Sequence, residues 1–402
     1  MVDIQQTQQR IDFKHEASAM RDVLVNWRRD LHRHPEVGFE VHRTAAFVAA
    51  ELRALGMTVQ EGVGRTGVVG LLEGAHDGPT VLWRADMDAL PIQEENDIPY
   101  ASTVPGKMHA CGHDGHVAIG LGVARLLAAH RGQLHGRVKF MFQPAEEMGA
   151  GGALAMIRDG VLEDPEPDIS LGLHLWNTLP LGKVGVAAGP IMSGSSFFNL
   201  KIHGLAGHAA MPHTTVDPVA CAGQLISALH TIVGRKMDAM AGAVVLSVTS
   251  VESSSHAFNA IPAYVTLGGT FRTFNAYTSE MLEQHIRAVA TSVCESVGCE
   301  VDIQIRHPNI PVVNDPDVVA RVREVFSTMI DPRDLIEERT MASEDISYVL
   351  EDVPGVFFFL GSSNAEAGRM YGHHHPQFDF DEDALPLGVA LACSAIGSYL
   401  LW

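Results

Sequence analysis

The stretch Thr80–Pro91, TVLWRADMDALP, indicates the fold most directly. Its apolar start is typical of a strand buried on both faces, and Asp86 and Asp88 follow on the same side of the chain because strand side chains alternate. Further apolar runs lie at 68–72, 138–142, 169–175 and 356–361, with helical patterns at 41–56 and after Asp114. This alternation predicts an α/β domain with a largely parallel sheet, whose motifs lie at strand ends.

A different rhythm begins after Gly189. Strand, helix, strand, strand, helix and strand are expected at 196–204, 217–236, 243–251, 263–274, 278–298 and 299–306. This β-α-β-β-α-β order is that of the ferredoxin-like unit. We therefore expect an inserted lid and dimerisation domain at 190–305, and a discontinuous metal-binding catalytic domain at 1–189 and 306–402.

The composition of the chain indicates its size class, its possible partners and its compartment. The chain has 402 residues, 46% of them hydrophobic, which describes an ordinary globular protein of two-domain length. A formal charge of -20 would repel phosphate backbones and anionic lipids, so we expect no nucleic acid and no membrane partner. Five scattered cysteines and a polar start without a secretory signal favour a reducing, cytoplasmic setting.

The C-terminal segment 384–402 has no charged residue over a length close to that of a membrane-spanning helix. Proline, glycine and serine interrupt it, so we expect a buried core helix instead. The acidic run Asp381-Glu382-Asp383 just before the segment is expected to cap that helix.

The segment KMHACGHD, residues 107–114, places a thiolate donor and an imidazole donor two residues apart, at Cys111 and His113. Both can turn toward one point, because they lie in a glycine-containing loop before a helix. The neighbouring His109 and His116 could also bind a metal. In a chain with 21 histidines, a loop histidine beside a free thiol is the alternative reading.

The segment QPAEE ends in the adjacent Glu146 and Glu147, whose side chains must point in different directions. One can bind a metal while the other removes the proton of an attacking water, as metal-assisted hydrolysis requires. The alternative is a helix N-terminus stabilised by two acids.

Other polar positions are ambiguous when taken singly. Asp86 and Asp88 could orient a ligand or form a turn before Pro91. His174 lies in an apolar run where a histidine is usually a satisfied core residue, and the three consecutive histidines at 373–375 cannot all face one site. The GVGRTG at 62–67 precedes a strand rather than a helix, so we interpret it as a turn.

Taken together and in order, eight stretches resemble the M20 metallopeptidase clan, in its amidohydrolase branch of hippurate hydrolases, indole-acetyl-amino-acid hydrolases and N-acyl-L-amino-acid deacylases. They are RRDLHRHPEVGFE, WRADMDALP, HACGHDGH, FQPAEE, LGLHLW, GHAAMPH, NAIP and HHHPQFDFDEDALP. The resemblance extends from about Arg28 to Leu391.

The resemblance implies a binuclear centre with two divalent ions per subunit, which could be Mn²⁺, Zn²⁺, Co²⁺ or Ni²⁺. Its implied metal ligands are Cys111, His113, Glu147, His174 and His374, with Cys111 bridging the ions. His374 is preferred to His375 because the family's ligand lies two residues before the proline. Asp86 stands where the wider clan has a ligating histidine.

The resemblance also implies roles outside the metal ligands. Glu146 matches the general base and Asp88 the family's active-site aspartate, while His208 resembles a histidine that stabilises the tetrahedral intermediate, often across a dimer interface. Asn259 and Arg272 resemble residues that bind the carboxylate side of the substrate. Two departures, Leu205 in GLAGHAA and the polar stretch 253–258, could alter the substrate pocket or the dimer contact.

The function implied is metal-dependent hydrolysis of the amide bond of N-acyl amino acids, with Glu146 as general base and acid, by a homodimer or dimer-based oligomer. A dipeptidase or carbamoylase of the same clan is the enzymatic alternative. A metal-binding regulatory protein without activity is the other, although such a protein has no need for a base beside its metal.

Overall fold

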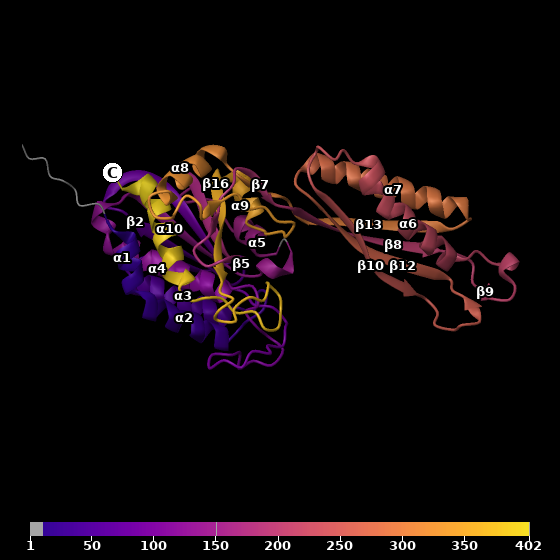
Figure 1. The fold of residues 1–402 in the computed structure, drawn as a ribbon, viewed down its shortest axis with the longest axis horizontal. Coiled ribbons are helices and arrows are strands. Elements are labelled where there is room, and N and C mark those ends of the chain that lie inside the picture. The colour runs from indigo at the N-terminus through magenta and orange to yellow at the C-terminus, as the bar shows by residue number, and fades with distance from the viewer. Residues whose placement is uncertain (1–10, 150, 402) are drawn as a thin grey trace, which may run out of the picture. The chain divides into compact units, whose positions relative to one another are not determined.

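The computed structural model describes residues 11–149 and 151–401, which form two compact units. Unit 1 comprises Met1–Gly189, Asn314–Glu338 and Tyr348–Trp402, and unit 2 comprises Pro190–Val313 and Arg339–Ser347. Figure 1 labels the elements of both. Unit 2 therefore runs past the predicted boundary at 305 and takes in a short later segment, because Met192 and Thr340 form a parallel bridge.

Unit 1 is built on an eight-stranded sheet in the order β1-β2-β4-β3-β5-β16-β6-β15. Its strands are β1 (Thr58–Val63), β2 (Gly67–Glu73), β3 (His76–Asp86), β4 (His135–Gln143), β5 (Ile169–Pro180), β6 (Val184–Gly185), β15 (Leu335–Ile336) and β16 (Gly355–Ser363). The central strands β4, β3, β5 and β16 are parallel. All of β3 from Val81 to Asp86 is buried, so both faces of the sheet are covered there.

The prediction of a largely parallel sheet is wrong at the edges, where the sheet is mixed. β1 pairs antiparallel with β2, β2 with β4, and β6 with β16. The GVGRTG stretch forms the tight turn between β1 and β2, as interpreted from the sequence, and a connection this short can join only antiparallel strands. A short connection through Gly182, at φ 90°, likewise reverses the chain between β5 and β6. As a result β6 runs antiparallel to β16, its neighbour in the sheet.

The helices of this part of the chain surround the sheet. They are α1 (Phe13–Ala19), α2 (Arg21–Arg33), α3 (His42–Ala54), α4 (His113–Ala129), α5 (Gly152–Arg158), α8 (Pro316–Phe326), α9 (Ser347–Asp352) and α10 (Ala384–Leu400). The last of them, α10, packs beside α4 although the two are far apart in sequence (Figure 1). Most of its apolar residues, including Leu385, Val389 and Ile396, are fully buried, which confirms the expected core helix.

No helix within residues 11–149 and 151–401 is long and apolar enough to cross a membrane. Asp383 of the acidic run is the N-cap residue of α10, but its side chain makes no capping hydrogen bond. Instead Asp383 pairs with Arg21 at 2.7 Å, and Glu382 pairs with Arg29 at 2.6 Å. Arginines that the sequence places far away are the stronger partners for these carboxylates.

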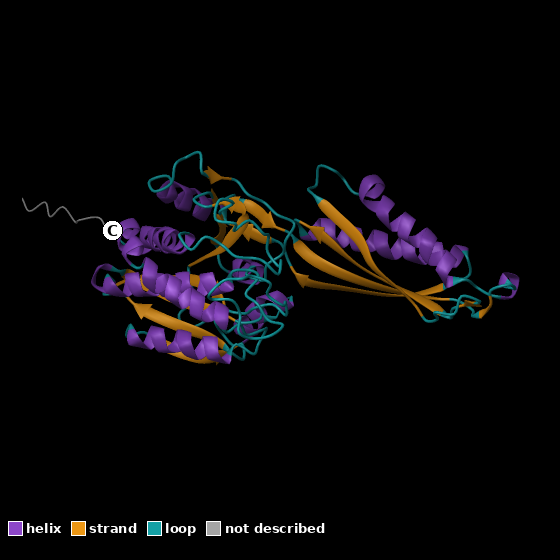
Figure 2. Cartoon of the chain, turned by 60° about the horizontal axis from the view of Figure 1, so that its bottom comes forward, coloured by secondary structure: helices purple, strands orange, loops and turns teal. Residues whose placement is uncertain are grey.

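Unit 2 contains a four-stranded antiparallel sheet in the order β10-β12-β8-β13, with helices α6 and α7 on one face (Figure 2). Its elements are β8 (Gly194–His203), α6 (Pro218–Lys236), β10 (Val244–Ser253), β12 (Tyr264–Thr273), α7 (Ala276–Ser296) and β13 (Glu300–Asn309). The element order is the expected β-α-β-β-α-β. Both helices begin at side-chain caps, Asp217 and Asn275, whose oxygens accept backbone N–H bonds of the first turn.

Two short pairings complete the fold. β9 (Gly207–His208) pairs with β11 (Ala260–Ile261), and β7 (Gly189–Met192) pairs with β14 (Val312–Asn314). Short 3₁₀ turns lie at Arg131–Gln133, Glu146–Met148 and Pro212–Thr214. The alternating burial of β8 directs Phe198, Leu200 and Ile202 into the core of unit 2, beneath its two helices.

Candidate metal centre

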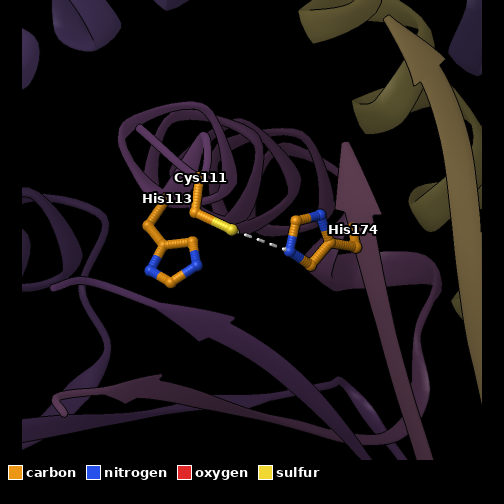
Figure 3. A group of neighbouring side chains, drawn as sticks. All are labelled: Cys111, His113 and His174. Atoms are coloured by element: carbon orange, nitrogen blue, oxygen red, sulfur yellow. Dashed lines mark hydrogen bonds between the residues drawn. The ribbon is translucent and has the colours of Figure 1, made fainter. Parts of the chain in front are cut away.

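The candidate metal centre lies in unit 1, around the carboxyl ends of β3, β4 and β5, where α/β sheets commonly hold their ligands. Cys111 and His113 come from the loop and first turn of α4, and His174 from within β5; Figure 3 shows their side chains gathered around one point. The Sγ atom of Cys111 is 3.5 Å from Nε2 of His174. All three residues are buried, so the donors meet away from bulk water.

The predicted ligands form two overlapping groups whose donor atoms lie within 4.8 Å of one another. One group is Cys111, His113 and His174, and the other is Cys111, Glu147 and His374. Cys111 belongs to both, which is the position that a bridging thiolate needs. A third group joins His113 to Glu146 and Glu147.

Backbone carbonyls select the tautomers of the two buried histidines. Nδ1 of His113 donates to the carbonyl oxygen of Asp88 at 2.8 Å, and Nδ1 of His174 donates to that of Leu175 at 2.7 Å. Nε2 of each neutral ring therefore carries a lone pair. Nε2 of His113 is buried and makes no hydrogen bond among the described residues. Such an unsatisfied ring nitrogen, close to the carboxylates of Asp86 and Glu147, fits a bound cation.

The three consecutive histidines diverge, as the sequence analysis expected. Nε2 of His374 lies 3.2 Å from Oε1 of Glu147. His375 stacks on Tyr371 instead, and His373 accepts a hydrogen bond from the backbone N–H of Asn177. His374 has φ 65°, a left-handed conformation that is costly for a non-glycine residue and typical of functional sites.

Both ring nitrogens of His116 are engaged, although His116 also forms a group of possible donors with Asp86 and His113. Its Nδ1 lies 2.6 Å from a carboxylate oxygen of Asp86, and its Nε2 accepts the backbone N–H of Leu175 at 2.9 Å. Asp86 also accepts from Arg84 at 2.6 Å, so both of its oxygens are engaged. Asp86 therefore holds His116, whose other ring nitrogen accepts from the backbone next to His174.

Asp88 holds the backbone of the adjacent Glu146 and Glu147 in place. Its two carboxylate oxygens accept the backbone N–H groups of Glu146 at 3.0 Å and Glu147 at 3.3 Å. Ala145, just before them, has φ 54° and turns the chain sharply after β4. Asp88 therefore acts on the centre by fixing the backbone of both glutamates.

Electrostatics favour a cation at this place. Burial lowers the pKa of His113, but Asp86, Glu147 and Asp88 outweigh it and raise that pKa to about 10. Burial, together with Glu147 and Glu146, raises the pKa of the Cys111 thiol well above its usual value. Burial and His116 lower the pKa of His174, leaving a neutral imidazole. A divalent ion would compensate these carboxylates and displace the protons of Cys111 and His113.

The other predicted site residues lie in unit 2 and at opposite ends of it. His208 is exposed on β9 and opposes Ala260, and the backbone N–H of Ala209 donates to the carbonyl oxygen of Asn259 at 3.0 Å. Arg272 is half-buried near the far end of β12, with its guanidinium 5.5 Å from the ring of Phe197. Unit 2 thus brings His208 and Asn259 together but not Arg272.

The departures from the family pattern flank His208. Leu205 is 56% exposed and pairs with Val216, and Phe258 is fully exposed in the polar stretch 253–258. One set of residues near the centre was not identified from sequence: Arg28, Asp114 and Asp379 form buried ion pairs. Their only sequence signal was their place in stretches quoted for the resemblance.

The fold and the donor groups define a metal-dependent hydrolase, and comparisons with known proteins agree. The model of Peptidase family M20/M25/M40 matches residues 82–398. The chain is 40% identical to IAA-amino acid hydrolase ILR1-like 4 of Arabidopsis thaliana, over 94% of this chain and 86% of that protein. It is 36% identical to N-acetylcysteine deacetylase of Bacillus subtilis, over 91% and 94%. The chain therefore belongs to family M20/M25/M40, in its amidohydrolase branch of metal-dependent amide hydrolases.

A solved structure of the same family shares the fold. The YXEP protein of Bacillus subtilis, described as a dinuclear metal-binding peptidase of the M20 family, superimposes with a TM-score of 0.81 at 33% identity, over 94% of this chain and 98% of that one. The donor groups of this chain fit divalent metal binding of the same kind.

Proposed function

We propose that this chain hydrolyses the amide bond of N-acyl amino acids at a binuclear centre held by Cys111, His113, Glu147, His174 and His374. The observation that carries the proposal is the sharing of Cys111 between two donor groups, with Glu146 beside them. The names of the two relatives support the substrate class, because both denote enzymes acting on an acylated amino acid.

The two glutamates divide the work. Both glutamates are grouped with His113, and Glu147 is also grouped with Cys111 and His374, whereas Glu146 is outside that second group and is 8% exposed. Bound divalent ions would supply a Lewis acid that lowers the pKa of water and polarises the amide carbonyl. Glu146 accepts the proton of the attacking water and returns it to the departing nitrogen. Asp88 supports these roles by accepting hydrogen bonds from the backbone N–H groups of both glutamates.

The oxyanion partner in this proposal is His208, acting from a second copy of the chain. Backbone N–H of Ala210 donates to Nδ1 of His208 at 3.0 Å, so the neutral ring carries its proton on Nε2, a donor suited to an oxyanion. His208 lies beyond the end of β8, whereas the chain enters unit 2 before Gly194 at the start of that strand. The ten residues of β8 therefore place His208 about 30 Å from the point where the chain enters unit 2.

Exposed apolar side chains support an interface between copies at this end of unit 2. Leu205, Met211, Val219 and Phe258 are each about half-exposed or more and lie near β9 and β11. A second copy would cover them, since symmetric dimers are the commonest oligomers. Asn259, next to His208, and Arg272, at the other end of unit 2, are proposed to bind the substrate carboxylate from different copies of the chain. All five cysteines are unpaired, which supports the expected cytoplasmic, reducing compartment.

The test of the proposed activity is a substrate panel. Protein reconstituted separately with Mn²⁺, Zn²⁺ and Co²⁺ is offered hippurate, N-acetyl amino acids and indole-acetyl conjugates, and release of the free amino acid is measured. Dipeptides and N-carbamoyl amino acids serve as the contrasting substrates. Preferential hydrolysis of either would replace the proposal by the dipeptidase or carbamoylase alternative. Bound metal without hydrolysis of any of them would favour the regulatory alternative.

Subunit mixing tests the role of the second copy. His208→Ala and Glu146→Gln subunits are each nearly inactive alone, but a mixed dimer contains one site with both residues intact if His208 serves the partner. Recovery of activity on mixing, up to about one site in two, is expected. Mixed dimers that form and stay inactive would place both residues at the site of their own subunit.

A further inference from the structure

A buried group of charges in unit 1 lies next to the proposed metal centre without belonging to it. Arg28 of α2 is fully buried, and its guanidinium contacts Asp114 at 2.8 Å, Asp379 at 2.8 Å and Glu382 at 3.3 Å. The rings of Tyr100 and Phe380 lie 4.8 Å and 4.3 Å from the guanidinium carbon. A guanidinium with three carboxylates is an expensive arrangement to bury and calls for an explanation beyond packing.

The carboxylates that contact Arg28 belong to two segments of the chain, and each segment carries a proposed metal ligand. Asp114 directly follows His113 in the first turn of α4, and its Oδ2 also lies 2.8 Å from Nδ1 of His32. Asp379 and Glu382 lie near the end of the segment 364–383, between β16 and α10, which we name the His374 loop. A single side chain therefore joins the start of α4 to the loop that carries His374.

The His374 loop depends on such anchors because its middle is exposed. His374 is the one exposed residue among the five proposed ligands, and most of 365–375 is exposed, whereas 378–382 is buried. At the ligand itself, the backbone N–H of His374 donates to the carbonyl oxygen of Ala110 at 2.8 Å. At the buried end, the hydroxyl of Tyr100 donates to Asp379 at 2.8 Å, and Arg28 holds the other carboxylate oxygen.

We propose that Arg28 is a positioning residue of the metal centre, which sets the separation of His374 from His113 by tying the His374 loop to the start of α4. The inference rests on the proposed binuclear centre. Arginine suits this task because its planar fork reaches several carboxylates at fixed angles, which the single ammonium of lysine cannot do. Loss of the fork should loosen the His374 loop and weaken the metal group that includes His374, while the group of Cys111, His113 and His174 keeps its ligands.

The test is Mn²⁺ binding by Arg28→Lys, which keeps the charge and removes the fork. Arg29→Lys is the matched control: Arg29 is the next residue on α2 and binds the same Glu382, but its side chain is 38% exposed and it contacts neither Asp114 nor Asp379. Manganese content after dialysis and Mn²⁺ affinity are measured on the full chain, together with the melting temperature with and without Mn²⁺. We expect Arg28→Lys to bind one equivalent like the parent and the second at least about tenfold more weakly, with Arg29→Lys unchanged.

A structural role alone would lower the melting temperature of metal-free and metal-loaded protein equally and leave both affinities unchanged, and that result would overturn the proposal. Equal effects of Arg28→Lys and Arg29→Lys on the second equivalent would do the same. If Arg28→Lys does not fold, Asp379→Asn is measured in its place against the same criteria. A parent that binds no divalent metal would instead contradict the proposed centre itself, so the two failures are distinguishable.

Discussion

The two units differ in the hydrogen bonds of the histidines for which we propose functions. In unit 1, His113 and His174 are buried and donate from Nδ1 to backbone carbonyls, which leaves a lone pair on Nε2 for a cation. In unit 2, His208 is exposed, and its Nδ1 accepts a backbone N–H, which leaves a proton on Nε2. The comparison shows that the backbone hydrogen bond at Nδ1 decides whether a histidine is suited to bind metal or to donate to an anion.

The largest expected effect concerns the unit 1 side of this contrast. Cys111→Ser should weaken metal binding by at least about 10²-fold, because a hydroxyl is a far poorer ligand than a thiolate and Cys111 belongs to two donor groups. Elemental analysis and activity after dialysis give the measurement. Cys393→Ser is the control, since Cys393 is a buried thiol of α10 with no donor group among the described residues. Equal metal content and activity in parent and Cys111→Ser would refute the assignment.

For His208 of unit 2 we predict a loss of turnover without a loss of metal. His208→Ala should lower kcat by about 10² with KM and metal content nearly unchanged, because a donor to the oxyanion acts only in the transition state. His213→Ala, an exposed histidine shortly after His208, should change neither quantity. A loss of metal in His208→Ala would contradict the proposal that His208 donates to the oxyanion and does not bind metal.

The smallest predicted effect is on pH-dependent stability in the absence of metal. Burial raises the pKa of Asp379, but Arg28 and Tyr100 outweigh it and the pKa is lowered. A carboxyl group with a lowered folded pKa stabilises the protein above its unfolded pKa of about 3.9, and that stability is lost as the pH falls through the folded value. The urea midpoint of the parent should therefore fall more steeply below about pH 4 than that of Asp379→Asn. Parallel curves would contradict this contribution.

The local patterns of the chain were enough to predict most elements and the position of the centre. Apolar runs ended at Asp86 and Gln143, and the donors that follow them do meet at strand ends. The order of elements in unit 2 also followed from periodicity. These features depend on side chains close in sequence, which is why a sequence reveals them.

Features that depend on distant pairing were missed. The antiparallel edges of the sheet result from which strands meet, and an apolar run such as 68–72 does not encode its partner. The sequence did not reveal that Asp86 and the backbone of Leu175 engage both ring nitrogens of His116. Likewise, nothing near Arg28 in the sequence points to Asp379, which lies 351 positions away.

The adjacent glutamates test the account most directly, because they share a backbone segment and are assigned different roles, Glu146 as base and Glu147 as metal ligand. Glu146→Gln and Glu147→Gln are compared side by side for metal content and for turnover of an N-acyl amino acid. We predict that Glu146→Gln keeps parental metal content and loses turnover by about 10² or more, while Glu147→Gln loses metal. Metal loss in Glu146→Gln with full occupancy in Glu147→Gln would contradict the assignment of base and ligand.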